Sequence, residues 1–330
     1  MNANVPDETH PDELSNEDRA KLMRSATYAS VSVASFLIVV KLIGWLFTGS
    51  VSILASLLDS AMDVMASLIN LFAVRYALMP PDAEHRFGHG KAEPLASLGQ
   101  SLIIAASALL LAKHAFTQMG SEQTLTAPGV GVVVMIISLI STLGLVTYQR
   151  HVVRKTQSTA IKADALHYLG DLLTQSAALL VTVLAMIGWE GIDPYIALGI
   201  AAYVFHSAWE IGKESFHYLM DRELPAEIRE RIIELVHTHE EVEGLHDLKT
   251  RRSGPNLFIQ MHLELDDHMP LIQAHRISDE VEAILIKAYP HAEVLIHQDP
   301  VSHYRPKPPS PKSESANIAT ETPENTSQTD

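Results

Sequence analysis

Long apolar segments occupy the first two thirds of the chain and end abruptly near residue 220. Three stretches, residues 94–112, 123–149 and 172–189, contain no Asp, Glu, Lys or Arg. A helix needs about 20 apolar residues to cross the roughly 30 Å hydrocarbon core of a bilayer. A soluble all-helical core would not leave charge-free stretches of this length. The pattern therefore predicts six transmembrane helices, at about residues 25–47, 51–78, 94–116, 128–150, 159–187 and 192–217.

The pattern changes after residue 220 to that of a small soluble domain. Apolar positions on one helix face predict helices at about residues 225–239 and 270–289. Apolar and polar residues alternate from Leu257 to Leu265, which predicts a strand, and a preceding strand begins near His246. With a last strand at 293–297, the order helix, strand, strand, helix, strand is typical of an α/β ferredoxin-like (metallochaperone-like) fold.

Both ends of the chain are polar. Residues 1–18 hold six acidic residues and no basic one, and the chain after about residue 304 is rich in Pro, Ser, Thr and Glu. Such segments cannot bury enough apolar surface to fold. We therefore expect four regions: an acidic disordered tail at 1–20, a transmembrane domain at 21–220, a cytoplasmic domain at 221–300 and a disordered tail at 301–330.

Basic residues mark one side of the predicted membrane domain. The short connections 48–50, 118–127 and 188–191 contain no Lys or Arg. The opposite set of connections, with the segment before the first span, contains Arg19, Lys21, Arg24, Arg75, Arg86, Lys91, Arg150, Arg154, Lys155 and Lys162. The positive-inside rule then predicts that both termini and the soluble domain are cytoplasmic.

Charge and composition exclude other classes of protein. A formal net charge of -15 over 330 residues argues against a nucleic-acid partner, which requires a basic surface. The chain has no cysteine, so disulfide frameworks, thiolate zinc sites and thiol catalysis are excluded. Charged residues make up 19% of the chain, below the roughly 25% of a soluble protein, as expected for a chain that enters a bilayer.

Ionisable side chains inside the predicted spans require a reason, because each costs about 2.5–3.5 kcal/mol on an insertion scale. Asp59 and Asp63 are four residues apart in the second span, and His167 and Asp171 repeat this spacing in the fifth. Each pair therefore shares one helix face, and the four side chains can converge on a tetrahedral divalent metal ion. The alternative is a polar seam of interhelical hydrogen bonds. Lys41 in the first span is interpreted as structural, either paired with an acidic neighbour or snorkelling.

The connection after the second span contains a further group of metal-ligand residue types. Asp82, His85 and His89 can provide three ligands within a turn. The spacing differs from the metalloprotease HExxH motif, because Arg86 stands where the general-base Glu would be. Solvated loop histidines remain the alternative.

The soluble domain is rich in histidine. We expect antiparallel neighbouring strands to bring its candidate ligands together, while surface histidines are the alternative for any one of them. Imidazole and carboxylate without thiolate suit Zn²⁺, Fe²⁺, Co²⁺ or Cd²⁺ and disfavour Cu⁺. The candidates are His246, His262, His275, His297 and Asp299.

Five short strings, taken in their order along the chain, resemble the cation diffusion facilitator family. The similarity is greatest to its bacterial zinc and iron exporters of the YiiP/FieF type, and it extends over about residues 20–300. The strings are LDSAMD at 58–63, HRFGHGKAE at 85–93, DALHYLGD at 164–171, LHDL at 245–248 and IHQDP at 296–300.

The resemblance implies roles for individual residues. Asp59, Asp63, His167 and Asp171 match the family's transport site midway through the membrane, and Asp82, His85 and His89 match its loop site. His246, His262, His275, His297 and Asp299 match a cytoplasmic binuclear site at the interface of a homodimer, in which Asp299 bridges two ions. Lys91 and Asp221 match a charge pair that joins the membrane and cytoplasmic halves in the dimer.

The implied activity is proton-coupled export of divalent transition metals across the bacterial inner membrane, not enzyme catalysis. Zn²⁺ is the expected cargo and structural metal, followed by Fe²⁺ and Cd²⁺. Metal binding displaces protons from its ligands, so an inward proton gradient can drive metal out. A passive divalent-cation channel, a membrane-anchored metal sensor and an intramembrane hydrolase are the alternatives. The hydrolase would need an open coordination position, whereas four protein ligands fill the expected membrane site.

Overall fold

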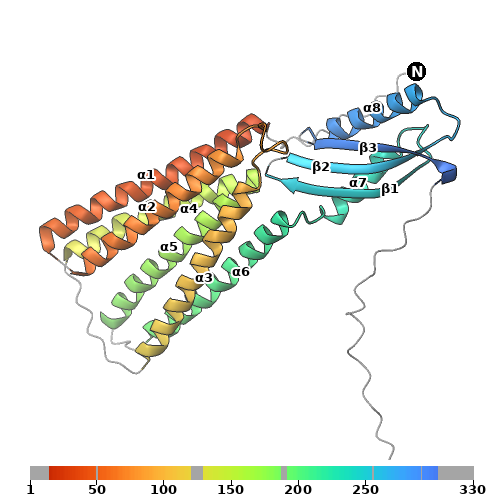
Figure 1. Ribbon diagram of the computed structural model, residues 1–330. Coiled ribbons are helices and arrows are strands. Elements are labelled where there is room, and N and C mark those ends of the chain that lie inside the picture. The colour runs from red at the N-terminus through yellow and green to blue at the C-terminus, as the bar shows by residue number, and fades with distance from the viewer. Residues whose placement is uncertain are drawn as a thin grey trace, which may run out of the picture.

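The computed structural model describes residues 15–49, 51–119, 129–186, 192–254, 256–290 and 292–303. A bundle of long helices and a smaller α/β domain lie end to end (Figure 1). Residues 1–14 and 304–330, which hold most of the two predicted tails, lie outside the described residues. So do most of the two longer connections that are predicted to lack basic residues. The helices of the bundle are α1 (Asn16–Thr48), α2 (Val51–Ala77), α3 (Ala92–Gln118), α4 (Gly129–Thr156), α5 (Thr159–Met186) and α6 (Asp193–Leu219).

Helix α1 begins before the apolar segment that predicted it. Ser15 caps its N-terminus by accepting a hydrogen bond from the backbone N–H of Asp18 at 3.1 Å. Lys21 then pairs with Glu17 at 2.8 Å, one turn along the helix. Capping and i,i+4 pairing stabilise helix in polar sequence, so α1 extends beyond its apolar part.

Four described segments are long and apolar enough to cross a membrane: Glu17–Thr48, Ser56–Ala77, Ala92–Thr117 and Val132–Thr156. These lie in α1 to α4. Helices α5 and α6 have similar lengths, but no part of them is among these four segments. The count of six membrane crossings therefore stays a prediction.

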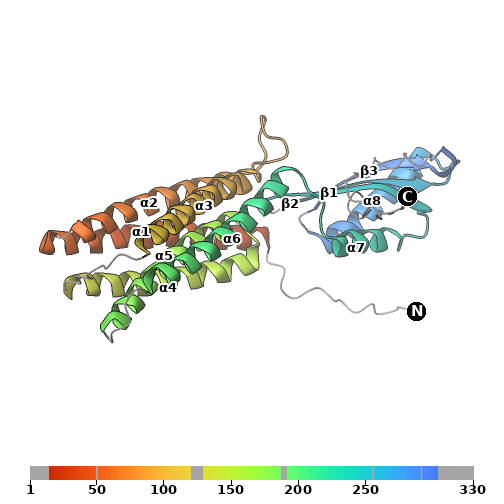
Figure 2. The ribbon, with the colours of Figure 1, turned by 90° about the horizontal axis from the view of Figure 1, so that it is seen from below.

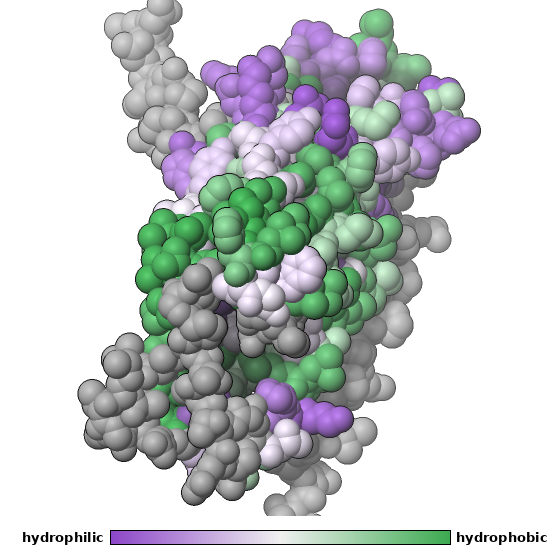
Figure 3. Space-filling view, turned by 90° about the vertical axis from the view of Figure 1, so that its left-hand side faces the viewer, coloured by the Kyte–Doolittle hydropathy of each residue, from purple (hydrophilic) through white to green (hydrophobic). Residues whose placement is uncertain are grey.

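The outer surface of the bundle is strongly apolar. Large hydrophobic side chains such as Phe47, Phe72 and Leu110 are 84%, 64% and 66% exposed. Figure 3 shows a broad field of hydrophobic residues on one face, with hydrophilic residues gathered beyond its edge. Contact of such a surface with lipid tails carries no hydrophobic cost, whereas its exposure to water is unfavourable.

Small polar residues join the helices inside the bundle. Ser67 of α2 and Tyr168 of α5 share a hydrogen bond of 2.7 Å between their hydroxyl groups. Ser215 of α6 donates to Ser97 of α3 at 2.8 Å. Hydroxyl pairs of this kind let helix backbones approach closely and fix the rotation of one helix against another.

The C-terminal domain packs two helices against one face of a three-stranded sheet in the order β1-β2-β3 (Figure 2). Its elements are α7 (Ala226–Val236), β1 (Gly244–Ser253), β2 (Asn256–Leu265), α8 (Leu271–Ala288), β3 (Ala292–Pro300) and the short 3₁₀ helix η1 (Val301–His303). Ile259, Met261 and Leu263 of β2 point into the core, where they meet Ile232 of α7 and Ile277 of α8. The predicted order of elements is confirmed.

The predicted strand directions were right for one pair and wrong for the other. Strands β1 and β2 form an antiparallel hairpin, but β2 and β3 run parallel. The physical reason is the intervening helix: α8 runs back along the sheet, so β3 starts again at the same end as β2.

Two backbone segments meet without side chains where the bundle joins the C-terminal domain. A Cβ atom added to Gly90 would lie 2.5 Å from the carbonyl oxygen of Ser253, in the β1–β2 hairpin. A Cβ added to Gly254, whose φ is +58°, would lie 3.0 Å from the Cα of Gly90. Beside this contact, Phe87 stacks edge-on against Phe258 at 5.9 Å, and the Arg251 guanidinium lies 4.2 Å from the Phe258 ring centroid.

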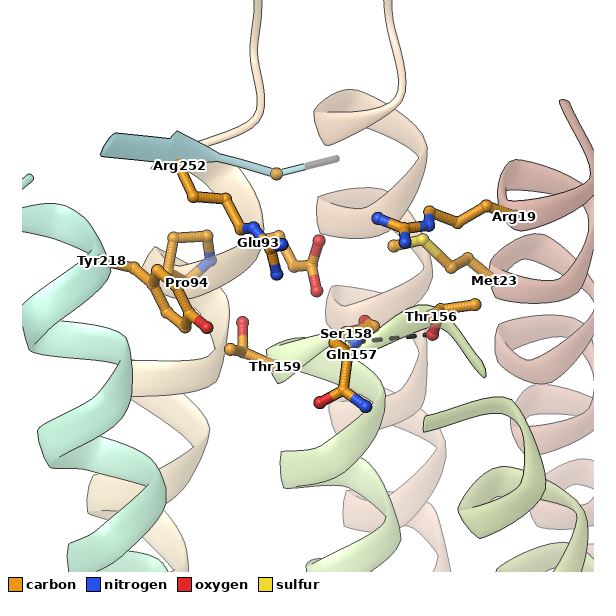
Figure 4. Close-up of a pocket in the computed structure, with 11 residues that line it drawn as sticks. Arg19, Met23, Glu93, Pro94, Thr156, Gln157, Ser158, Thr159, Tyr218 and Arg252 are labelled. Atoms are coloured by element: carbon orange, nitrogen blue, oxygen red, sulfur yellow. Dashed lines mark hydrogen bonds between the residues drawn. The ribbon is translucent and has the colours of Figure 1, made fainter. Parts of the chain in front are cut away.

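A small cavity of about 30 Å³ lies at the same junction (Figure 4). Glu93 projects into it and is 5% exposed, with Arg19 and Arg252 reaching toward it from opposite sides. The backbone N–H of Ala160, in the first turn of α5, donates to Glu93 Oε1 at 3.4 Å. A carboxylate is stabilised at the N-terminus of a helix, so Glu93 ties α3 to α5.

Replacing Gly90 by alanine tests the backbone contact at this junction. Because the new Cβ has no room beside Ser253, the loop and the hairpin must separate. We expect faster amide hydrogen exchange at residues 85–89 and 251–253 in the variant. Gly99→Ala is the control, since its Cβ would meet nothing within 4 Å. Equal exchange in G90A and the wild type would contradict the contact.

Candidate metal centres

Three side chains from two helices meet inside the bundle. Nε2 of His167 lies 3.1 Å from Oδ1 of Asp63 and 3.9 Å from Oδ2 of Asp171. The side chains of Asp63, His167 and Asp171 are 11%, 23% and 29% exposed, so water reaches them only partly. A tetrahedral ion with bonds of about 2.0–2.1 Å holds its ligand atoms roughly 3.3 Å apart. The distance from His167 to Asp63 is close to that value, and the distance from His167 to Asp171 is longer.

The position of this cluster follows from the helix spacing. Asp63 is near the middle of α2, about 20 Å from either end at 1.5 Å per residue. His167 and Asp171 are one turn apart on α5, so both face α2 together. An ion held here would lie deep inside the bundle.

Asp59 and Lys41 lie beside the cluster without joining it. Asp59 is exposed one turn away from Asp63 on α2, and it is not among the residues whose ligand atoms lie within 4.8 Å of one another. Lys41 is 4% exposed, and its ammonium donates to the Ser60 hydroxyl at 2.6 Å and to the Ser56 carbonyl at 3.1 Å. The structure thus gives Lys41 hydrogen-bond partners on α2, as a structural role requires.

A buried carboxylate one turn from His167 was missed as a separate feature in the sequence. Asp164 is 1% exposed and accepts hydrogen bonds from Ser30 at 2.6 Å, Gln149 at 2.7 Å and Gln100 at 3.3 Å. These donors belong to α1, α4 and α3. They fix the rotation of α5 and therefore the direction in which His167 points. Its i,i+3 spacing from His167 was the signal available in the sequence.

A second cluster lies in the loop between α2 and α3. Asp82 Oδ2 is 3.1 Å from His89 Nε2, and Asp82 Oδ1 is 3.5 Å from His85 Nδ1. The His89 side chain is 1% exposed, and its Nδ1 has no hydrogen-bond partner among the described residues. A buried imidazole nitrogen without a partner is unfavourable unless something binds it.

The loop itself prepares the carboxylate of this second cluster. Asp82 Oδ1 accepts hydrogen bonds from the backbone N–H groups of His85 at 2.6 Å and Glu84 at 2.9 Å. The His85 bond is the main reason that the pKa of Asp82 lies below its ordinary value. Asp82 is therefore ionised and held toward both histidines.

The third cluster is a row of histidines across the sheet of the C-terminal domain. His246 of β1 is directly opposite His262 of β2, which is opposite His297 of β3. All three belong to the sheet face that α7 and α8 leave uncovered. Their rings are close, with centroids 5.0 Å apart for His246 and His262 and 4.6 Å apart for His262 and His297.

Asp299 connects the members of this row. It lies 2.7 Å from Nδ1 of His262, 3.3 Å from Nε2 of His246 and 3.2 Å from Nε2 of His297. Partial burial raises the pKa of Asp299, but the His262 hydrogen bond and the neighbouring imidazoles outweigh it and leave the pKa below the usual range. His246, His262 and Asp299 can together hold one metal ion.

Two carboxylates near the row were not predicted, and one predicted ligand is elsewhere. A bulge between His246 and Lys249 gives Asp247 a φ of 49° and brings its carboxylate to 4.0 Å from Nε2 of His262. Glu264 accepts from Nδ1 of His246 at 2.7 Å, which orients that ring. His275 lies on α8, exposed and 3.7 Å from Asp279. It is not part of the three-residue group in this chain.

The predicted charge pair connects the two halves of a single chain. Lys91 Nζ lies 2.9 Å from Asp221 Oδ2, and Arg251 reaches the other oxygen of Asp221 at 3.4 Å. Asp221 therefore links the start of α3 to strand β1. All three groups are partly exposed, so the pair orients the junction more than it stabilises it.

Known families match the chain in two consecutive parts. Residues 27–220 match the family described as "Cation efflux transmembrane domain". Residues 224–301 match the one described as "Cation efflux protein, cytoplasmic domain".

Curated relatives are similar over most of the chain. The cation-efflux pump FieF of Serratia proteamaculans is 50% identical over 283 residues, which are 86% of this chain and 94% of that protein. FieF of Klebsiella pneumoniae is 49% identical over 287 residues, 87% of this chain and 96% of that protein. Among solved structures, the zinc form of CzrB is 37% identical and covers 26% of this chain and 98% of its own, with a TM-score of 0.25.

Replacing His262 by alanine removes the central member of the histidine row. We expect the Zn²⁺ affinity of this cluster to fall at least about 100-fold. Removal of a group that only orients a ligand already costs about 10–100-fold in affinity, and removal of the ligand itself costs more. Calorimetric titration of the purified full chain measures the affinity. His268→Ala, which removes an exposed histidine of the same domain, should leave the titration unchanged. A wild-type titration in H262A would remove this cluster from the metal centres.

Proposed function

Because the chain belongs to the cation efflux family, the cation diffusion facilitators, we propose that it exports Zn²⁺ from the cytoplasm in exchange for protons. It is a multi-pass bacterial membrane protein of a family of divalent-metal transporters. The observation that carries the proposal is the convergence of Asp63, His167 and Asp171 between α2 and α5.

A single nitrogen atom explains why protons and metal would exchange. Nε2 of His167 is the atom that both carboxylates approach. A hydrogen bond from this nitrogen to an ionised carboxylate requires a proton on Nε2, whereas a metal ion requires its lone pair. The proton and the metal ion therefore exclude each other at the same position.

The donor set favours zinc over the common light cations. One imidazole with carboxylates suits tetrahedral Zn²⁺, and it accepts Fe²⁺ and Cd²⁺ as well. Mg²⁺ prefers octahedral oxygen coordination and keeps its waters. We assign Asp59 as the fourth ligand, because it is one turn from Asp63 on α2. A change of its side-chain rotamer would bring its carboxylate toward the other three ligands.

The direction of transport follows from coupling this exchange to alternating access. When the site opens to the cytoplasm, metal binds and displaces protons from the ligands. When it opens to the other side, where the proton concentration is higher, protons return and metal leaves. The proton gradient then drives export, with the basic end of the bundle and the C-terminal domain in the cytoplasm.

The other two clusters have supporting roles in this proposal. The uncovered sheet face with its histidine row would bind structural zinc where two copies of the C-terminal domain meet, and His275 would contribute to that homodimer site. The cluster of Asp82, His85 and His89 lies beside the junction of the two domains. Metal bound there would stiffen the α2–α3 loop.

Replacement of a ligand on α2 or on α5 tests the transport site. Asp63→Asn and His167→Ala should each reduce Zn²⁺ uptake into proteoliposomes to the level of protein-free vesicles, because each removes a ligand from the same ion. His151→Ala on α4 and Asp193→Asn at the start of α6 are matched controls outside the cluster. Folding is checked by gel filtration. Normal uptake by both site variants would refute the assignment.

The coupling is tested by imposing a pH gradient across the same vesicles. We expect Zn²⁺ uptake to rise with an outward-directed proton gradient. We also expect uptake to make the lumen more alkaline, because protons leave the vesicle as Zn²⁺ enters. Uptake that ignores the gradient and moves no protons would indicate a passive channel. Binding without uptake of Zn²⁺ or Fe²⁺ would instead indicate a sensor.

A further inference from the structure

A groove with a volume of about 560 Å³ lies between α4, α5 and α6, away from the three metal clusters. It is at the end of the bundle nearest the C-terminal domain. Each helix contributes one face to it: Arg150 and Arg154 on α4, Lys162 and Leu166 on α5, and positions from Tyr203 to Ile211 on α6. At 1.5 Å per residue the α6 part is about 12 Å long.

The lining changes in character along this length. Arg154 and Lys162 lie near the helix ends, beside the short connection between α4 and α5. Farther into the bundle Leu166 and Leu169 of α5 face a mixed lining on α6, where His206, Ser207 and Glu210 lie between Tyr203 and Ile211. Tyr203 is 50% exposed. Cationic groups near the helix ends, with leucines on one wall below them, match the order of phosphate and acyl chain in a phospholipid.

Two guanidinium groups of the groove have no carboxylate partner among the described residues. Lys162 is paired with Glu214, but no carboxylate of the described residues lies within 4.0 Å of Arg150 or Arg154. These two arginines are one turn apart on α4, within its last two turns. Planar guanidinium groups bind phosphate oxygens in bidentate fashion.

We propose that this groove binds an anionic glycerophospholipid, with its phosphodiester between Arg150 and Arg154 and its acyl chains starting against Leu166 and Leu169. Glu210, the carboxylate among the lining residues, would accept hydrogen bonds from a hydroxylated headgroup such as glycerol. The excess of cations repels a divalent metal ion, so the groove is no metal pathway. The bound lipid would join α4 to α6 across α5, which contributes His167 and Asp171 from its other side.

Lipid binding to the purified, delipidated full chain tests the proposal. The measurement needs no metal ion and no transport assay, so it is independent of the proposed function. The probes are dioleoyl phosphatidylglycerol and dioleoyl phosphatidylcholine, which have the same acyl chains and differ in their headgroups. Native mass spectrometry counts the lipid molecules bound to each protein. We expect the wild type to retain phosphatidylglycerol preferentially. Arg150→Gln/Arg154→Gln should weaken its binding about 30-fold, at about 1 kcal/mol for each basic residue. Binding of phosphatidylcholine should not change.

The control removes two positive charges from the same end of the bundle but outside the groove. Arg24→Gln/Lys155→Gln should retain wild-type binding, because neither residue lines the groove. Arg150→Lys/Arg154→Lys keeps the charge and should recover part of the affinity, which also controls for folding. An equal loss of phosphatidylglycerol binding in R24Q/K155Q would mean that the lipid is attracted by the overall positive charge of this end of the bundle. That result would overturn the site. Full competition by millimolar inorganic phosphate would overturn the lipid as the occupant, and unchanged binding in R150Q/R154Q would do the same.

Discussion

Charged side chains inside an apolar bundle are the constraint on which the rest of the structure depends. The carboxylates of Asp63 and Asp171 lose most of their water, and in such surroundings two anions are tolerated only beside a cation or a shared proton. His167 meets both needs, provided that α2 and α5 keep their rotation. The hydrogen bonds that Asp164 accepts from three other helices hold α5, and the Ser67–Tyr168 pair joins it to α2. These polar contacts between four neighbouring helices and α5 thus serve one small region.

The sequence predicted those parts of the protein that depend on periodicity. The i,i+4 pairs placed Asp63, His167 and Asp171 on facing helix surfaces, and the alternation in β2 assigned its two faces. It could not give the direction of β3, because that depends on how α8 packs on the sheet. Nor could it find Asp247, which reaches His262 only through a bulge that periodicity does not record. Asp59 shows the same limit: spacing fixes its helix face but not its rotamer.

The junction between the two domains lies next to one of the metal clusters. Phe87 is two residues from both His85 and His89, and it packs on Phe258 of the sheet that carries His262. Gly90 follows His89 directly and touches the β1–β2 hairpin through its backbone. A change in the loop therefore reaches the C-terminal domain through rigid, short-range contacts, with Lys91 and Asp221 setting the orientation beside them.

The row formed by His246, His262 and His297 exists because three strands share one register. In a strand, neighbouring residues point to opposite faces, so a shift by one position reverses every side chain. Insertion of one residue between Asn256 and His262 would turn that imidazole toward the helices while leaving the hydrogen bonds of the sheet available. The register of β2 is therefore as necessary to this metal chemistry as the identity of His262 itself.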